Sequence, residues 1–233
     1  MDDLPADLRI TVAGAGAIGG FIGARLAASG TPVNILARGQ TLAALQRQGL
    51  RLVTREESLD IPVTASDNAG DFGVQDLLII AVKGPSLPAL APSLRPLIGP
   101  QTIILPTMNG VPWWFCQTGG GYTPFALKSV DPDDSIARHL PTTQTLGCVV
   151  HIGASCDAPG IVRHAMGKEL ILGDALGGFS ARTEAIAALF ERAGLEIKRS
   201  SDIRRDIWYK LWGNLTMNPV SALTGATIDR LLG

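Results

Sequence analysis

The chain has 233 residues, 46% of them hydrophobic, with 20 Lys and Arg against 21 Asp and Glu. A formal net charge of −1 excludes a generally basic nucleic-acid-binding protein. The uncharged stretch from 10 to 24 has only 15 residues and five glycines, too short for a membrane span of about 20 apolar residues, so no membrane partner is expected.

The N-terminus and the cysteines indicate a cytoplasmic protein. Residues 1–5 are acidic and lack the basic region that opens a signal peptide. The three cysteines, Cys116, Cys148 and Cys156, show no CxxC spacing and are odd in number. We therefore expect free thiols in a reducing compartment rather than disulfides or a metal site.

Strands and helices alternate over the first half of the chain. Short β-branched or apolar runs predict strands at 9–13, 33–37, 50–54, 59–64, 76–82 and 102–105. Helices are predicted at 17–29, 41–48 and, interrupted by prolines, 86–97. This order predicts an α/β fold with a doubly wound parallel sheet of the Rossmann type.

The second half begins with a segment that has no periodicity, 117–143, which we expect to be a long loop. Three strands that we expect to be antiparallel follow at 145–152, 160–164 and 169–172. A helix at 181–192, a strand at 196–199 and a last helix from 202 to about 217 complete the prediction.

A glycine-rich turn stands between the first strand and the first helix. Its residues, Gly14, Ala15, Gly16, Ala17, Ile18 and Gly19, form the pattern GxGxxG. The first glycine permits the tight turn, the second lets a pyrophosphate approach the backbone, and the third lets helix and strand pack closely. This position predicts a dinucleotide-binding site at the helix N-terminus.

The charges near this turn favour NADP(H) over NAD(H). Residues 8–55 contain six arginines and neither Asp nor Glu. An NAD-specific fold places an acid about 20 residues past the glycines. Arg38 stands there instead, and a guanidinium can pair with a 2′-phosphate.

Candidate site residues follow the later strands. Lys83 and Asn109 lie at carboxyl ends of predicted strands, where ligands bind in open α/β sheets. Lys210 and Asn214 share one helical face, opposite an apolar stripe formed by Trp208, Leu211, Trp212 and Leu215 that we expect to be core or a dimer interface. Pro219 disfavours helical geometry at Asn218, which we expect to point into the site from a helix end.

Together these residues resemble the ketopantoate reductase (2-dehydropantoate 2-reductase) family. The matching segments are GAGAIGG at 14–20, LARG at 36–39, AVK at 81–83, MNG at 108–110, PGIVRH at 159–164, DIRRDIWYKLWGN at 202–214 and NPVSALTG at 218–225. The resemblance covers nearly the whole chain apart from 117–143. It implies NADPH-dependent reduction of a 2-keto acid, ketopantoate above all, on the way to pantothenate and coenzyme A.

The resemblance also implies residue roles. Lys210 matches the catalytic lysine, and Asn214 and Asn218 match asparagines that orient the substrate. Asn109 and Lys83 match positions near the nicotinamide and the substrate. It further implies two domains, a dinucleotide-binding domain over 1–200 and, over 201–233, the first helices of an all-α substrate domain. Most of the family's helical domain is expected to be missing.

A second feature separates this sequence from the family pattern. The bulky run Pro112-Trp113-Trp114-Phe115 follows Asn109-Gly110. Such bulky side chains beside the expected site are compatible with another 2-keto acid as substrate or with a lid over the site.

Two other functions stay open: a β-hydroxyacid or 6-phosphogluconate type of dehydrogenase, and a non-catalytic NADP-binding remnant. The three histidines, His139, His151 and His164, lack further ligands at metal-binding spacing, so no metal is expected.

Overall fold

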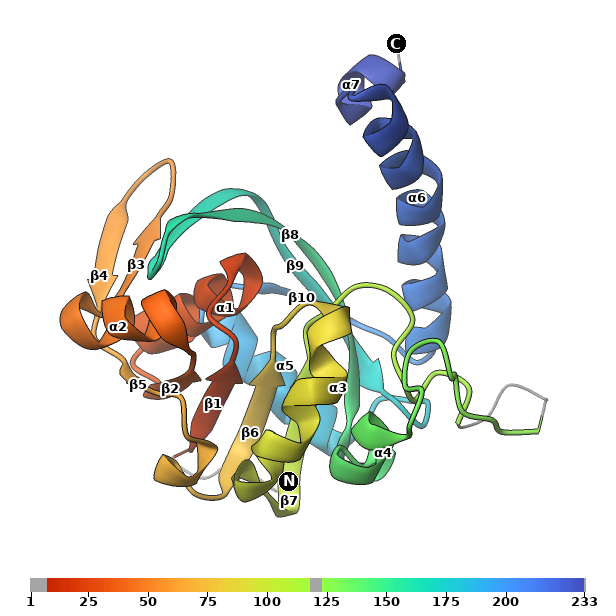
Figure 1. Ribbon diagram of the computed structural model, residues 1–233, viewed down its shortest axis with the longest axis horizontal. Helices are drawn as coiled ribbons and strands as arrows, with labels where there is room; N and C mark the ends of the chain where they lie inside the picture. Colours follow the sequence, from red (N-terminus) through yellow and green to blue (C-terminus); the bar gives the residue numbers. More distant parts are fainter. Residues whose placement is uncertain (1–7, 118–122, 233) are drawn as a thin grey trace.

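The computed structural model describes residues 8–117 and 123–232, and two sheets lie at its centre (Figure 1). The first sheet is parallel and has the strand order β5-β2-β1-β6-β7. Its strands are β1 (Ile10–Ala13), β2 (Val33–Leu36), β5 (Thr64–Ser66), β6 (Gln75–Ile80) and β7 (Ile98–Pro106). The predicted doubly wound α/β architecture is therefore confirmed.

A long hairpin dominates the second sheet and arches over the first helix (Figure 1). Strands β8 (Leu146–Ala158) and β9 (Ile161–Asp174) are antiparallel to each other. Strand β9 pairs in parallel with β3 (Leu50–Val53) at its start and with β10 (Glu196–Arg199) near its end. Strand β4 (Ser58–Ile61) completes this sheet as the antiparallel partner of β3.

Helix α1 (Ala17–Ala28) lies between the two sheets and packs against both. Its side toward β9 carries Gly20, where a Cβ atom would lie 2.5 Å from a methyl carbon of Val162. Phe21, Ile22 and Leu26 fill the core on the same helix. The glycine excess of this segment thus allows one helix to be buried between two sheets.

The remaining helices lie around this core. They are α2 (Gly39–Gln48), α3 (Leu87–Leu90), α4 (Ser135–His139), α5 (Ala181–Arg192), α6 (Ile203–Thr224) and α7 (Ile228–Leu231). Short 3-10 segments are η1 (Ala69–Asp71), η2 (Gly84–Ser86), η3 (Ala91–Leu97) and η4 (Thr142–Gln144). None of the helices within the described residues is both long and apolar enough to cross a membrane.

The structure corrects three sequence-based predictions of secondary structure in part. Residues 160–164 and 169–172 belong to one strand, β9, because the exposed residues 165–168 continue it without apolar alternation. The helix expected at 86–97 keeps only four α-helical residues, since prolines at 88, 92 and 96 each remove a backbone donor. The loop expected at 117–143 contains α4, which the buried Asp131 carboxylate caps by accepting the backbone N–H groups of Ile136 and Ala137 at 3.0 Å. Residues 118–122 lie outside the described residues.

Contacts with other described residues anchor helix α6 at its first two turns. Ile203 and Ile207 are buried, and the Arg204 guanidinium donates hydrogen bonds to the backbone carbonyls of Phe115 at 3.0 Å and Ala175 at 2.9 Å. Beyond them the helix rises away from both sheets, with α7 at its far end (Figure 1). The stripe that we expected to be core or an interface is not core among the described residues, since Trp208, Trp212 and Leu215 keep 56%, 67% and 60% of their surface exposed.

Candidate active site

A groove of about 840 Å³ lies at the carboxyl ends of the first sheet's strands. Its floor is the glycine turn at 14–16, and one side is formed by Arg38 and Thr41 at the start of α2. The other side comes from the tip of the β8–β9 hairpin, with Ala158, Pro159 and Gly160. Parallel strands and a helix N-terminus thus meet where Rossmann folds bind dinucleotides.

The glycine turn has the geometry that a pyrophosphate needs. Gly14 has φ +102°, in the left-handed region, and a Cβ there would lie 2.8 Å from Val82. A Cβ at Gly19 would collide with the carbonyl oxygen of Gly14. At Gly16 a Cβ would meet nothing within 4 Å, so this side of the turn is open. No side chain caps the N-terminus of α1, which leaves its backbone N–H groups for an anion.

Arg38 and an acid missed by the sequence analysis line the same groove. The Arg38 side chain is exposed and makes no hydrogen bond or ion pair with any described residue. Asp67, directly after β5, also lines the groove, because β5 lies beside β2 in the sheet. Sequence spacing places the expected acid at the end of β2, so it gives no signal for an acid after the neighbouring strand β5.

Lys210 and Asn214 line a second, polar cavity of about 720 Å³ between α6 and the hairpin. Among the described residues the Lys210 ammonium has neither a hydrogen bond nor an ion pair, whereas Lys198 in the same cavity pairs with Asp206 at 3.1 Å. Among the described residues, this cavity therefore contains one half-buried ammonium without an acceptor and one amide.

His151 lies in this cavity with Lys210, which the sequence analysis did not foresee. Burial, followed by the nearby Lys210 charge, lowers the pKa of His151 below its ordinary value, although Glu169 opposes the shift. The imidazole is therefore more often neutral near pH 7 than a free histidine. Its position on β8 could not be found from residue spacing, because it depends on how the hairpin packs against α6.

Asn109 connects the two sheets. Its amide nitrogen donates to the carbonyl of Val150 at 3.1 Å, and its amide oxygen accepts the N–H of Val150 at 3.1 Å. Both ends of the amide are thus occupied by the β8 backbone. The structure places Asn109 at the end of β7, as expected, and shows that it fixes the position of β8.

The other two predicted residues, Lys83 and Asn218, line none of these cavities. Lys83 is exposed and directly precedes η2, between Val82 in the dinucleotide groove and Gly84. The prediction that Asn218 sits at a helix end was wrong, because α6 continues through Pro219 to Thr224. The turns after Pro219 are stabilised by hydroxyl groups, including the Thr224 hydroxyl, which donates to the carbonyl of Val220 at 2.7 Å. Asn218 is exposed on α6, one turn beyond Asn214.

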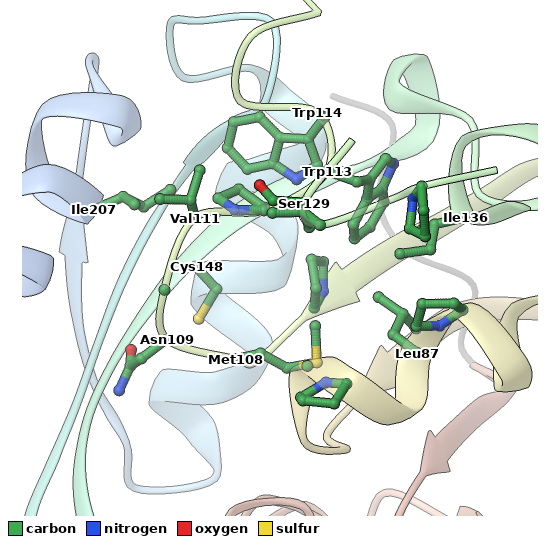
Figure 2. Close-up of a pocket in the computed structure, with 18 residues that line it drawn as sticks. Leu87, Met108, Asn109, Val111, Trp113, Trp114, Ser129, Ile136, Cys148 and Ile207 are labelled. Carbon is green, nitrogen blue, oxygen red and sulfur yellow. The ribbon is translucent and has the colours of Figure 1, made fainter. Parts of the chain in front are cut away.

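A third cavity, of about 410 Å³, lies beneath the Trp113 segment, and we call it the tryptophan cavity (Figure 2). Its walls come from the loop after β7, from α3, from α4 and the segment before it, and from β8 and α6. Met108, Val111 and Ile136 point toward its interior, whereas the Asn109 amide points away from it (Figure 2). None of the described side chains that line this cavity is charged.

Comparisons with known proteins identify the family of this chain. The family model "Ketopantoate reductase PanE/ApbA" matches residues 10–177, and the model of its C-terminal part matches residues 202–233. A 2-dehydropantoate 2-reductase of Mesorhizobium japonicum is 42% identical over 97% of this chain and 70% of its own length. The chain belongs to the ketopantoate reductase family.

Solved structures extend this likeness. A ketopantoate reductase candidate from Ralstonia solanacearum MolK2 is 52% identical with a TM-score of 0.94, over 97% of this chain and 70% of that one. D-mandelate dehydrogenase, solved with NADH and anilino(oxo)acetate, shares the fold at a TM-score of 0.80 and 21% identity, over 96% of this chain and 67% of that one. This ketopantoate reductase family member is an oxidoreductase, and the family implies a nicotinamide cofactor.

The described residues fit such a cofactor. The open side of Gly16, the uncapped N-terminus of α1 and the unpaired Arg38 all lie along one groove. No group of His, Cys, Asp or Glu among the described residues has an arrangement that could hold a metal ion.

Proposed function

We propose that this protein reduces a 2-keto acid to the 2-hydroxy acid with NADPH, and that 2-dehydropantoate, named for its relatives, is a substrate. The observation that carries the proposal is the Lys210 ammonium, which has no partner among the described residues and shares a cavity with Asn214 between α6 and the second sheet.

Arg38 supports NADPH as the cofactor. An unpaired guanidinium in the groove can bind a 2′-phosphate through charge-assisted hydrogen bonds. The Asp67 carboxylate in the same groove repels a 2′-phosphate, so the preference for NADPH over NADH depends on both Arg38 and Asp67. When bound, the reduced nicotinamide supplies a hydride to the carbonyl carbon of the substrate.

Lys210 is the proton donor in this proposal. As the ketone carbon gains the hydride, negative charge builds on the oxygen, and an ammonium stabilises that charge and then transfers its proton. The oxygen becomes the hydroxyl of the product, and the lysine regains a proton from water. Asn214, one turn along the same face of α6, orients the substrate through its amide.

A direct assay tests this function. Purified protein is supplied with ketopantoate and either NADPH or NADH, and the loss of absorbance of the reduced nicotinamide is followed. Turnover with NADPH and formation of pantoate supports the proposal. Tight NADPH binding without turnover of any 2-keto acid contradicts it and supports a nucleotide-binding role, whereas activity on a 3-hydroxy acid alone supports the β-hydroxyacid type of dehydrogenase.

A further inference from the structure

Asp206 lies one helical turn before Lys210 on α6, and both residues line the same polar cavity. An acid four residues before a lysine is the arrangement in which two helical side chains ordinarily pair, because their Cβ atoms lie about 5–6 Å apart. Within the described residues, however, the Asp206 carboxylate and the Lys210 ammonium form no ion pair. The reason lies in the groups that bind the carboxylate instead.

Two side chains from outside α6 bind the Asp206 carboxylate, one at each oxygen. The Lys198 ammonium donates to Oδ1 at 3.1 Å, and the Ser200 hydroxyl donates to Oδ2. Only 20% of the Asp206 side chain is exposed, so water and salt screen these bonds less than they would at the surface. Both carboxylate oxygens thus have a partner that is not Lys210.

The second sheet fixes the position of both partners. Lys198 lies in β10, where it is paired with Ile171 of β9. The backbone N–H of Ser200, directly after β10, donates to the carbonyl of Leu172 at 2.8 Å. The end of a sheet strand therefore determines where the Asp206 carboxylate lies on α6.

We propose that Lys198, assisted by Ser200, is a positioning residue that holds the Asp206 carboxylate away from Lys210 and keeps the Lys210 ammonium free for the keto oxygen of the substrate. The inference rests on the proposed function and adds to it a residue that does not touch the substrate. Without Lys198, the Asp206 carboxylate pairs with Lys210. That pair is present before and during the reaction, so the ammonium stabilises the charge that develops on the keto oxygen less well.

The remaining polar groups near Lys210 are the same whether or not Lys198 is present. Those that line the cavity with it and can carry a charge, among the described residues, are His151, Glu169, Arg199, Asp202, Arg205 and Tyr209. Their effect on Lys210 cancels when the loss of Lys198 is compared between two proteins that differ only at residue 206. The experiment is therefore a double-mutant cycle.

The cycle measures kcat with ketopantoate and NADPH in the wild type, Lys198→Met, Asp206→Asn and the double variant. Lys198→Met should lower kcat about tenfold, because the Lys210 ammonium is then paired. The KM for NADPH should stay the same, since Lys198 does not line the dinucleotide groove. In the Asp206→Asn background the same substitution should change kcat less than about twofold, because no carboxylate is left to pair with Lys210.

Two outcomes of the cycle overturn the inference. An equal loss of kcat in both backgrounds shows that Lys198 does not act through Asp206, and an unchanged kcat in Lys198→Met shows that Lys198 does not act at all. Lys168→Met is the matched control, because Lys168 pairs with Glu196 of the same sheet at 3.3 Å and lies outside the cavity. It should leave kcat unchanged.

A second readout needs no turnover. A lysine amine in an ion pair reacts more slowly with acetic anhydride than a free one, and mass spectrometry of the intact variants after digestion gives the rate at each lysine. The rate at Lys210 relative to that at the exposed Lys83 should fall about threefold in Lys198→Met. It should recover in the double variant with Asp206→Asn.

The two readouts separate this inference from the function on which it rests. An unchanged acylation ratio in Lys198→Met overturns the inference even if the wild type reduces ketopantoate. Absence of turnover in every protein, the wild type included, overturns the proposed function, whereas the acylation ratio tests the hold on Asp206 by itself.

Discussion

Asn109 and Val150 exchange two hydrogen bonds of 3.1 Å, one in each direction, between a side-chain amide and a backbone. The two residues are 41 positions apart in sequence, and Asn109 lies in the loop after β7 of the first sheet whereas Val150 lies in β8 of the second. The contact therefore fixes the loop after β7 against β8, beside the cavity that contains Lys210.

Replacing Asn109 should cost stability as well as activity. Asn109→Ala removes both hydrogen bonds, and we expect the free energy of unfolding to fall by about 1–3 kcal/mol in urea denaturation. Gln101→Ala, at an exposed position of β7, is the control and should change it by less than about 0.5 kcal/mol. Equal stability of Asn109→Ala and the wild type would show that these bonds contribute nothing.

Lys210→Ala should abolish most of the turnover while cofactor binding is retained. Loss of a general acid lowers kcat by about 10²–10⁴-fold, and the groove that contains Arg38 lies elsewhere. Stopped-flow turnover and NADPH titration measure the two effects. Lys168→Ala removes an exposed ammonium that pairs with Glu196 at 3.3 Å and should leave kcat unchanged. A wild-type kcat in Lys210→Ala would remove this residue from the mechanism.

The cofactor preference should depend on Arg38. Arg38→Ala loses a charge-assisted contact with the 2′-phosphate, so the KM for NADPH should rise about 10–100-fold, while that for NADH changes little. Arg47→Ala, on the exposed side of the same helix, should behave like the wild type. Asp67→Asn should act in the opposite direction and lower the KM for NADPH. An NADPH to NADH ratio that is equal in all four proteins would contradict the assignment.

The lowered pKa of His151 predicts a specific loss of stability in acid. Between the folded pKa and the ordinary value of 6.5, the unfolded chain binds more protons than the folded one. Stability is thus fully present above pH 6.5 and falls as the pH decreases through that window. Urea midpoints of the wild type and His151→Gln between pH 8 and 5 measure the difference, and the variant should show the shallower decline. Parallel curves would show that His151 does not titrate differently on folding.

The sequence predicted what local patterns determine. The GxGxxG turn, the strand before it and the helix after it lie where the glycine and apolar spacing placed them. Lys210 and Asn214 share a helix face because a four-residue step determines this directly.

What the sequence could not supply depends on distant pairing. His151 and Asp67 reach their cavities through the packing of β8 on α6 and of β5 beside β2. Pro219 is a different case, since a statistical preference against helix at Asn218 was overridden by the turns on either side. Whether the exposed Trp208 and Trp212 mediate a homodimer stays a prediction.

The pairing of β3 with β9 has a consequence for synthesis on the ribosome. Arg51 in β3 lies opposite Ile161 in β9. A nascent chain of 110 residues therefore contains the glycine turn and β3 but lacks β9, the parallel partner of β3. The groove also needs Ala158, Pro159 and Gly160 as a wall. Contacts of such long sequence separation form slowly. Nucleotide binding should therefore be acquired late in translation, after residue 163 has left the exit tunnel.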